Sequence, residues 1–164
     1  MLTKLNRAKC RQSLIKLSLP QIVLDIFDDR ERPEELRDIC ESPYYIFSEL
    51  SECEVPDGGS ITPIWEHSIT ITAYQHSLPN GRFIEFSLES PEDVKVLGPS
   101  FKCVVADLLI YLWEYEISAD RLREIATQFE FDRVDELVAG CFATNDAGFQ
   151  EREEWHRKFV ASCA

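Results

Sequence analysis

The sequence predicts an α+β fold, in which a small antiparallel sheet centred on a β-hairpin packs against several helices. Two segments of alternating apolar and polar residues flank a turn and predict the hairpin, and a long apolar stretch with helical spacing follows it. The hairpin and the apolar stretch lie within residues 61–116. The length of 164 residues suits one domain with a substantial core and is short for two. We therefore expect a single domain, residues 1–164, organised around residues 61–116.

The hairpin is expected to join residues 68–74 to residues 82–88. Asn80 and Gly81 lie within the intervening turn, residues 78–81, where residues that tolerate a positive φ are needed. Trp65 comes just ahead of the first strand and is expected to pack over one edge of the sheet. The residues expected to face the core are Ile69, Ile71, Ala73, Ile84, Phe86 and Leu88.

The main core helix is expected to begin at Ser100, a good N-cap that follows Pro99. Its apolar stripe comprises Phe101, Val104, Val105, Leu108, Leu109, Leu112 and Tyr115. Shorter helices are expected over residues 21–27, 34–40, 119–131, 132–139 and 148–162. Residues 44–50 are apolar enough to be buried, but their pattern leaves helix and strand open. A short strand is expected near residues 94–97.

The chain is strongly acidic, with a formal net charge of -13 and a pI near 4.6. Such a charge disfavours binding to nucleic acid and to anionic membrane surfaces, because both attract lysine and arginine. It favours basic protein partners, although solubility alone also explains an acidic surface. Residues 25–57 hold twelve acidic residues and three arginines, which leaves -9 in this segment. No apolar run is long enough to cross a bilayer.

The first twenty residues have the opposite charge. They contain five basic residues and no acidic one, so we expect a first helix or arm that pairs with acidic surface, with organelle targeting as the alternative. No continuous apolar core of a secretory signal is present, and no zinc-type spacing of cysteine and histidine occurs. The six cysteines are therefore expected to be reduced, and the location to be cytoplasmic.

No motif of a phosphate-binding loop, a nucleophilic serine, a zinc protease or a calcium loop is present. His67 and His76 are an odd number of residues apart, which would place them on opposite faces of an unbroken strand, and His156 is isolated on a helix expected to be exposed. We therefore expect no metal, no cofactor and no catalytic residue. Carboxylates around the hairpin, including Glu66, are instead expected to form an acidic patch on its outward face.

Residues 61–113 resemble the SUKH superfamily, which includes yeast cell-wall assembly regulators and many bacterial immunity proteins. The resemblance rests on TPIWEH at residues 62–67, on the strand pair ITITAYQHSLPNGRFIEFSLE at residues 69–89, and on Gly98-Pro99-Ser100-Phe101 at the start of an apolar helix. It implies an α+β fold without catalysis and a binding role, often the neutralisation of a toxin. Nuclease toxins are commonly basic, so an acidic inhibitor would associate with them quickly.

We therefore expect a non-enzymatic, acidic protein-binding domain of the immunity type, with a basic partner if it has one. The alternatives are a small enzyme that uses Glu66, His67 or Asp93, and an oligomeric regulatory subunit with exposed aromatic surface around Trp155 and Phe159. The sequence leaves the oligomeric state open. The candidate binding residues are Glu66, Tyr74, Glu85, Glu89, Asp93, Glu52, Glu54 and Asp57.

Overall fold

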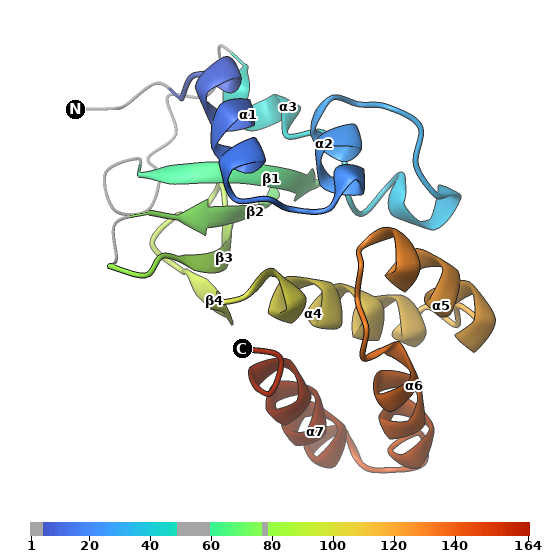
Figure 1. Cartoon of the computed structure of the whole chain (residues 1–164). Coiled ribbons are helices and arrows are strands. Elements are labelled where there is room, and N and C mark those ends of the chain that lie inside the picture. Colours follow the sequence, from blue (N-terminus) through green and yellow to red (C-terminus); the bar gives the residue numbers. More distant parts are fainter. Residues whose placement is uncertain (1–4, 49–59, 77–78) are drawn as a thin grey trace. The chain divides into compact units, whose positions relative to one another are not determined.

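The computed structural model describes residues 5–48, 60–76 and 79–164 (Figure 1). The chain forms two compact units, Met1–Val96 and Leu97–Ala164, called unit 1 and unit 2 and described separately. The sequence predicted a single domain organised around residues 61–116. That segment extends from unit 1 into unit 2. Helices combined with an antiparallel sheet confirm the predicted α+β fold.

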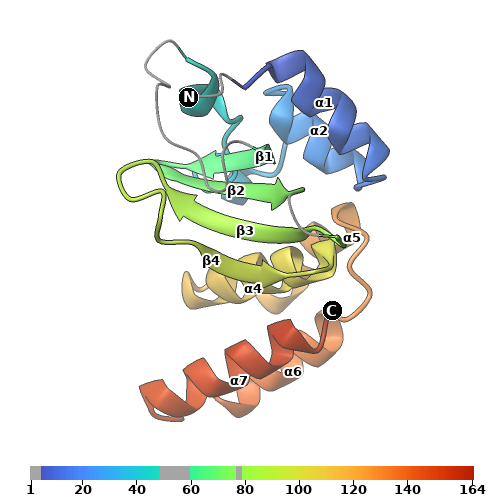
Figure 2. The same cartoon turned by 90° about the vertical axis from the view of Figure 1, so that its left-hand side faces the viewer.

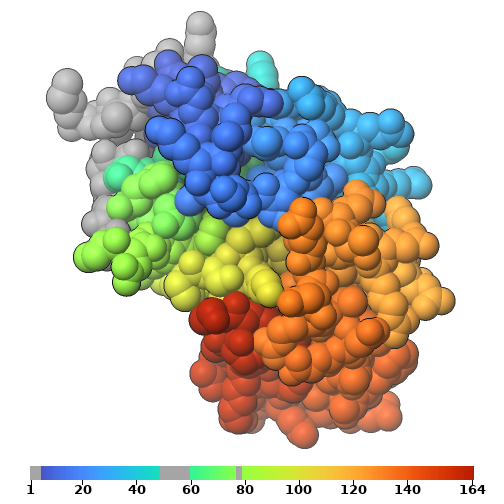
Figure 3. Space-filling model, in the orientation of Figure 1, coloured from blue at the N-terminus to red at the C-terminus, as the bar shows by residue number. Residues whose placement is uncertain are grey.

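Unit 1 begins with two helices that contact the sheet. Helix α1 (Arg7–Lys16) and helix α2 (Gln21–Phe27) contact each other and strand β1. On the face shown in Figure 3 their side chains adjoin without interruption. Asn6 caps α1 by accepting the Lys9 backbone N–H at 3.0 Å. The expected basic N-terminal segment therefore contains a helix that packs against α2 and β1 within unit 1.

The expected pairing of this helix with acidic surface is confirmed by one ion pair. The Arg11 Nε and Nη2 donate to the two carboxylate oxygens of Asp28, at 2.9 and 2.7 Å. This two-point geometry suits a guanidinium and a carboxylate. The hydrogen bond from Arg11 lowers the pKa of Asp28.

The sheet has the strand order β1-β2-β3-β4 among the described residues (Figure 2). Its strands are β1 (Ile61–His67), β2 (Thr70–Gln75), β3 (Arg82–Ser87) and β4 (Lys95–Gly98). The β2–β3 pair is the predicted hairpin, and β4 confirms the short strand expected near residues 94–97.

Strand β1 differs from the expectation, because the segment placed ahead of the sheet is itself a strand. Trp65 lies inside β1 and is 4% exposed, and does not cover an edge from outside. The pairing of β1 with β2 shifts register between Pro63 and Trp65. This bulge, together with burial of six successive residues, removes the alternation by which a strand is recognised.

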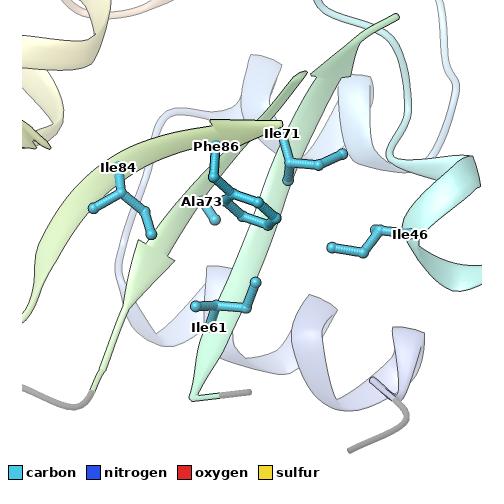
Figure 4. Close-up of a cluster of buried hydrophobic side chains, with 6 residues drawn as sticks. All are labelled: Ile46, Ile61, Ile71, Ala73, Ile84 and Phe86. Atoms are coloured by element: carbon cyan, nitrogen blue, oxygen red, sulfur yellow. The ribbon is translucent and has the colours of Figure 1, made fainter. Parts of the chain in front are cut away.

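One face of this sheet carries the core of unit 1. Figure 4 shows the side chains of its core cluster directed into a shared space: Ile46, Ile61, Ile71, Ala73, Ile84 and Phe86. Leu88 is partly buried against this cluster. Ile69 was expected to belong to it and does not; it lies in the turn between β1 and β2 and is 41% exposed.

The hairpin turn is built around Gly81, whose φ is +60°. A Cβ on Gly81 would lie 1.9 Å from the Tyr74 hydroxyl oxygen, so the tyrosine ring covers the glycine. The Tyr74 hydroxyl donates to the Asn80 carbonyl at 3.2 Å. Glycine is needed here both for its backbone conformation and for the space that Tyr74 occupies. Leu78 of the expected turn lies outside the described residues.

Unit 2 is helical after the end of β4. Helix α4 (Phe101–Glu114) contacts α5 (Ala119–Gln128), α6 (Val134–Ala143) and α7 (Phe149–Ala161). Ser100 accepts the Lys102 backbone N–H at 3.2 Å, which confirms the expected N-cap. The stripe of α4 is buried from Val104 to Leu112 as expected, but Tyr115 is 65% exposed because the helix ends one residue earlier.

The described cysteines, Cys10, Cys40, Cys103, Cys141 and Cys163, are free and buried. Cys53 lies outside the described residues. Burial raises the pKa of Cys10 to about 11 and that of Cys141 to about 12, so both remain thiols at neutral pH. None of the helices in the described part of the chain combines the length and the apolar character that crossing a bilayer requires.

Candidate functional site

The predicted hairpin patch is divided between the two faces of the sheet. Glu66 lies opposite Ile71, which in turn lies opposite Phe86, so Glu66 shares the face of the core cluster. Glu85 lies opposite Thr72, on the other face. Because successive residues of a strand alternate between faces, Glu66 and Glu85 cannot form one patch.

The expectation that Glu66 lies on the outward face of the sheet is therefore wrong. Its side chain is buried, with 2% of the residue exposed. Both carboxylate oxygens accept the backbone N–H of Tyr45, at 3.2 and 3.1 Å, at the first turn of helix α3 (Tyr44–Phe47). The carboxylate thus provides a hydrogen-bond acceptor for a backbone N–H at the start of α3, where Pro43 offers no side-chain cap.

Burial raises the pKa of Glu66, against the hydrogen bonds from α3, which lower it. The neighbouring Glu41 raises it further. Glu41 and Glu66 form an isolated antiparallel bridge, in which each backbone N–H donates to the other residue's carbonyl, at 2.8 and 2.9 Å. Glu66 therefore joins β1 to the segment that precedes α3 and to α3 itself.

The other predicted residues have separate surroundings. Tyr74 covers the hairpin turn, and Glu85 pairs with Lys95 of β4 at 3.2 Å. Glu89 and Asp93 are exposed in the connection after β3. Glu52, Glu54 and Asp57 lie outside the described residues. The structure thus gives Tyr74 and Glu85 local contacts within the sheet and leaves Glu89 and Asp93 at the surface.

A different surface of unit 1 brings acidic and aromatic groups together. It is a pocket of about 490 Å³, formed where the segment before α3, the end of β1 and the chain after β3 meet. We call it the Tyr45 pocket. Its lining residues are Asp38, Glu41, Tyr45, Ser48, His67, Ser68, Ile69 and Leu88.

The rim of the Tyr45 pocket exposes large side chains. Tyr45 lines the pocket and is 54% exposed. Its ring meets edge to face that of Tyr44, a neighbour outside the pocket lining that is 67% exposed, with centroids 6.1 Å apart. Ile69 adds an exposed aliphatic group, and its backbone carbonyl accepts the Leu88 N–H at 2.9 Å. Exposed tyrosine beside aliphatic surface is typical of protein interfaces.

The acidic groups of this pocket come from the acidic segment, residues 25–57, identified in the sequence. Nearer its start, the acidic side chains are paired within unit 1: Asp25 with Arg30 at 3.5 Å, and Asp29 with Arg32 at 3.1 Å. Asp38 and Glu41 lie further along and line the pocket. Part of the segment's charge is thus neutralised internally, whereas Asp38 and Glu41 line the pocket.

Sequence reasoning missed Tyr45 as a site residue, together with the exposure of its neighbour Tyr44. Their segment reads as apolar and was expected to be buried, and only Ile46 of its first three residues is. The signal that could have found them is the pair of adjacent tyrosines directly after Pro43. Successive residues of a helix point in different directions, so a helix of four residues cannot bury both rings in one core.

The histidines have three different settings. His67 lines the Tyr45 pocket, and the His76 Nε2 lies 2.7 Å from the Thr62 hydroxyl. His156 was expected to be isolated on an exposed helix, which is wrong: its Nε2 lies 2.8 Å from Asp107 Oδ1, and both side chains are mostly buried. Among the described residues no group of three or more histidine, cysteine or acidic side chains could hold a metal ion.

The residues predicted for the two alternative functions have different surroundings. Of Glu66, His67 and Asp93, only His67 is among the described residues that line the Tyr45 pocket, so the convergence expected of a catalytic site is not found there. Phe159, expected in an exposed aromatic surface, is 6% exposed and stacks on Trp155.

Comparison of the chain with protein-family models, curated proteins and solved structures finds no match.

Proposed function

We propose that this chain is a non-enzymatic binding domain whose Tyr45 pocket receives a basic segment of a partner protein. One observation carries the proposal: the exposed side chain of Tyr45 lines one concave surface together with Asp38 and Glu41, and the exposed ring of Tyr44 adjoins that of Tyr45. A lysine or arginine side chain would meet aromatic faces for its cation and its methylene groups, and carboxylates for its charge.

We further propose that the partner is a basic toxin and that the domain neutralises it. The net charge of -13 supports this, because an acidic surface accelerates encounter with a basic protein. The resemblance of residues 61–113 to the SUKH superfamily supports the same role.

The test begins with affinity capture by the full-length chain from extracts of the source organism, at low and at moderate salt. The captured protein is then purified, and its binding is measured by calorimetry. Tyr45→Ala should weaken binding about tenfold or more, the usual effect of a central tyrosine anchor. The helix start is retained in this variant, because the bond to Glu66 uses the Tyr45 backbone N–H.

Matched variants control for general effects. Tyr115→Ala removes an exposed tyrosine from unit 2, 65% exposed against 54% for Tyr45, and should leave binding unchanged. Asp38→Lys should slow association, whereas Asp146→Lys changes the net charge by the same amount at an exposed turn of unit 2 and should have a smaller effect. Equal effects of pocket and control variants, or capture of acidic partners only, would refute the proposal.

A further inference from the structure

Unit 2 contains a second pocket, of about 460 Å³, between α4, the end of α6 and α7. This volume lies within the range of small-molecule sites, roughly 300–1,000 Å³. We call it the Trp113 pocket. Two of the three tryptophans in the chain, Trp113 and Trp155, line it together with Phe149. The Tyr45 pocket is formed by residues of unit 1 alone, so the two pockets are distinct.

The aromatic walls of the Trp113 pocket are held by specific packing. A Cβ on Gly140 would lie 2.1 Å from Trp155 Cζ2, so the indole lies directly on the glycine. Trp155 also stacks on Phe159, with centroids 5.4 Å apart and planes at 22°, and the Arg133 guanidinium lies 4.8 Å from the centre of the Phe159 ring. Trp113 meets Phe142 edge to face at 4.7 Å. Trp155 is therefore held by contacts on α6 and α7, and Trp113 is placed beside Phe142.

The charge of the Trp113 pocket is negative. Its described lining includes the carboxylates of Glu114, Glu116 and Glu153 and one guanidinium, that of Arg152. His156, which also lines it, is tied to Asp107 at 2.8 Å. An anionic ligand would therefore meet a majority of like charges, whereas a cation would meet both carboxylates and aromatic faces.

We propose that the Trp113 pocket binds a small organic cation with an alkylammonium head group. Tryptophan is the aromatic side chain that attracts cations most strongly, and aromatic cages of this kind recognise quaternary ammonium groups. The carboxylates at the pocket supply charge complementarity. An apolar ligand would use the same indoles but would gain nothing from the three glutamates, so charge distinguishes the two classes.

Tryptophan fluorescence of the full-length chain can test this with choline as the probe and 3,3-dimethylbutan-1-ol as its neutral counterpart of the same shape. We expect a saturable change with choline, at an affinity about tenfold or more above that for the neutral alcohol. Equal affinities, or no saturable change with choline, would overturn the proposal. Tighter binding of Nα-acetyl-lysine methylamide than of choline would assign the pocket to a partner's side chain, and would overturn the small-molecule assignment.

Paired variants place the binding in this pocket. Glu114→Gln with Glu153→Gln keeps the side-chain shapes, removes two of the carboxylates and should weaken choline binding about tenfold. Glu124→Gln with Glu154→Gln makes the same change in net charge on α5 and α7 outside the pocket lining, and should leave the affinity unchanged. Equal loss in both double variants would overturn the assignment. A circular dichroism spectrum confirms that each variant is folded, and the comparison of choline with the alcohol decides the question on the unmodified chain.

Discussion

The backbone N–H of Tyr45 donates to both carboxylate oxygens of Glu66, at 3.2 and 3.1 Å, so that a buried acid holds the start of the helix bearing the exposed tyrosine pair. Two opposite effects act on the ionisation of Glu66. Burial disfavours the charged carboxylate, whereas the helix N-terminus favours it. Burial is the larger effect, and the pKa of Glu66 is raised.

Replacing Glu66 by Gln should give a stability difference between wild type and variant that depends on pH. The variant keeps a carbonyl acceptor for Tyr45 but cannot titrate. Because the folded pKa lies above the usual 4.5, wild-type stability relative to the variant is greatest below pH 4.5 and falls as the pH rises through the raised pKa. Urea unfolding of both proteins across this range measures the difference. A difference independent of pH would contradict the raised pKa.

Replacing Gly81 by Ala should destabilise the hairpin. The substitution forces an L-residue into a φ of +60° and places a Cβ where the Tyr74 hydroxyl lies. We expect a loss of about 1–3 kcal/mol in the free energy of unfolding. Gly148→Ala is the control, because Gly148 has a φ of -65° and nothing within 4 Å of an added Cβ; its effect should stay within about 1 kcal/mol.

The ion pair between Arg11 and Asp28 should titrate in the opposite direction to Glu66. Its carboxylate has a pKa below the usual 3.8, so its contribution is complete above pH 3.8 and is lost as the pH falls through the lowered value. A double-mutant cycle of Arg11→Gln and Asp28→Asn measures the coupling by chemical denaturation. The coupling should be favourable at neutral pH and vanish in strong acid, and a coupling unchanged by acid would exclude a charge interaction.

Gly140→Ala should displace Trp155. Alanine is intrinsically better than glycine in a helix by about 1 kcal/mol, but its Cβ would collide with Cζ2, Cε2 and Nε1 of the indole. Overpacking of this kind costs roughly 1–3 kcal/mol, so we expect net destabilisation and altered tryptophan emission. Trp155→Phe lacks the colliding atoms and should restore stability in the double variant. A double variant no more stable than Gly140→Ala alone would contradict this packing.

The β2–β3 hairpin and helix α4 could be predicted because their signals are local. Strict alternation around a turn containing Asn80 and Gly81 specifies a hairpin, and a capping serine followed by an apolar stripe specifies a helix. Strand β1 could not be recognised in the same way, because the bulge at Pro63 and Trp65 interrupts the period that defines a strand. The error at Glu66 follows from this, since the face of a residue is known only when its register is known.

The Tyr45 pocket could not be read from sequence for another reason. Its lining combines four residues between 38 and 48 with residues 67–69 and 88, which become neighbours only when β1 pairs with both β2 and Glu41. Similarly, the bond between His156 and Asp107 joins residues 49 positions apart. Such proximity depends on how helices and strands pack together. The pattern of residues along the chain predicts each helix or strand by itself and not the contacts between them.

Helix α3 spans only four residues, far fewer than an isolated helix needs to be stable in water. Its shape therefore depends on Glu66, and the sheet fixes the position of the tyrosine pair during folding. Under the proposed function, a partner that docks there would meet a preorganised recognition element, and the entropy of ordering that element would not be deducted from the binding free energy. Association would then follow rigid-body docking, and affinity differences among related partners would arise mainly from their dissociation rates.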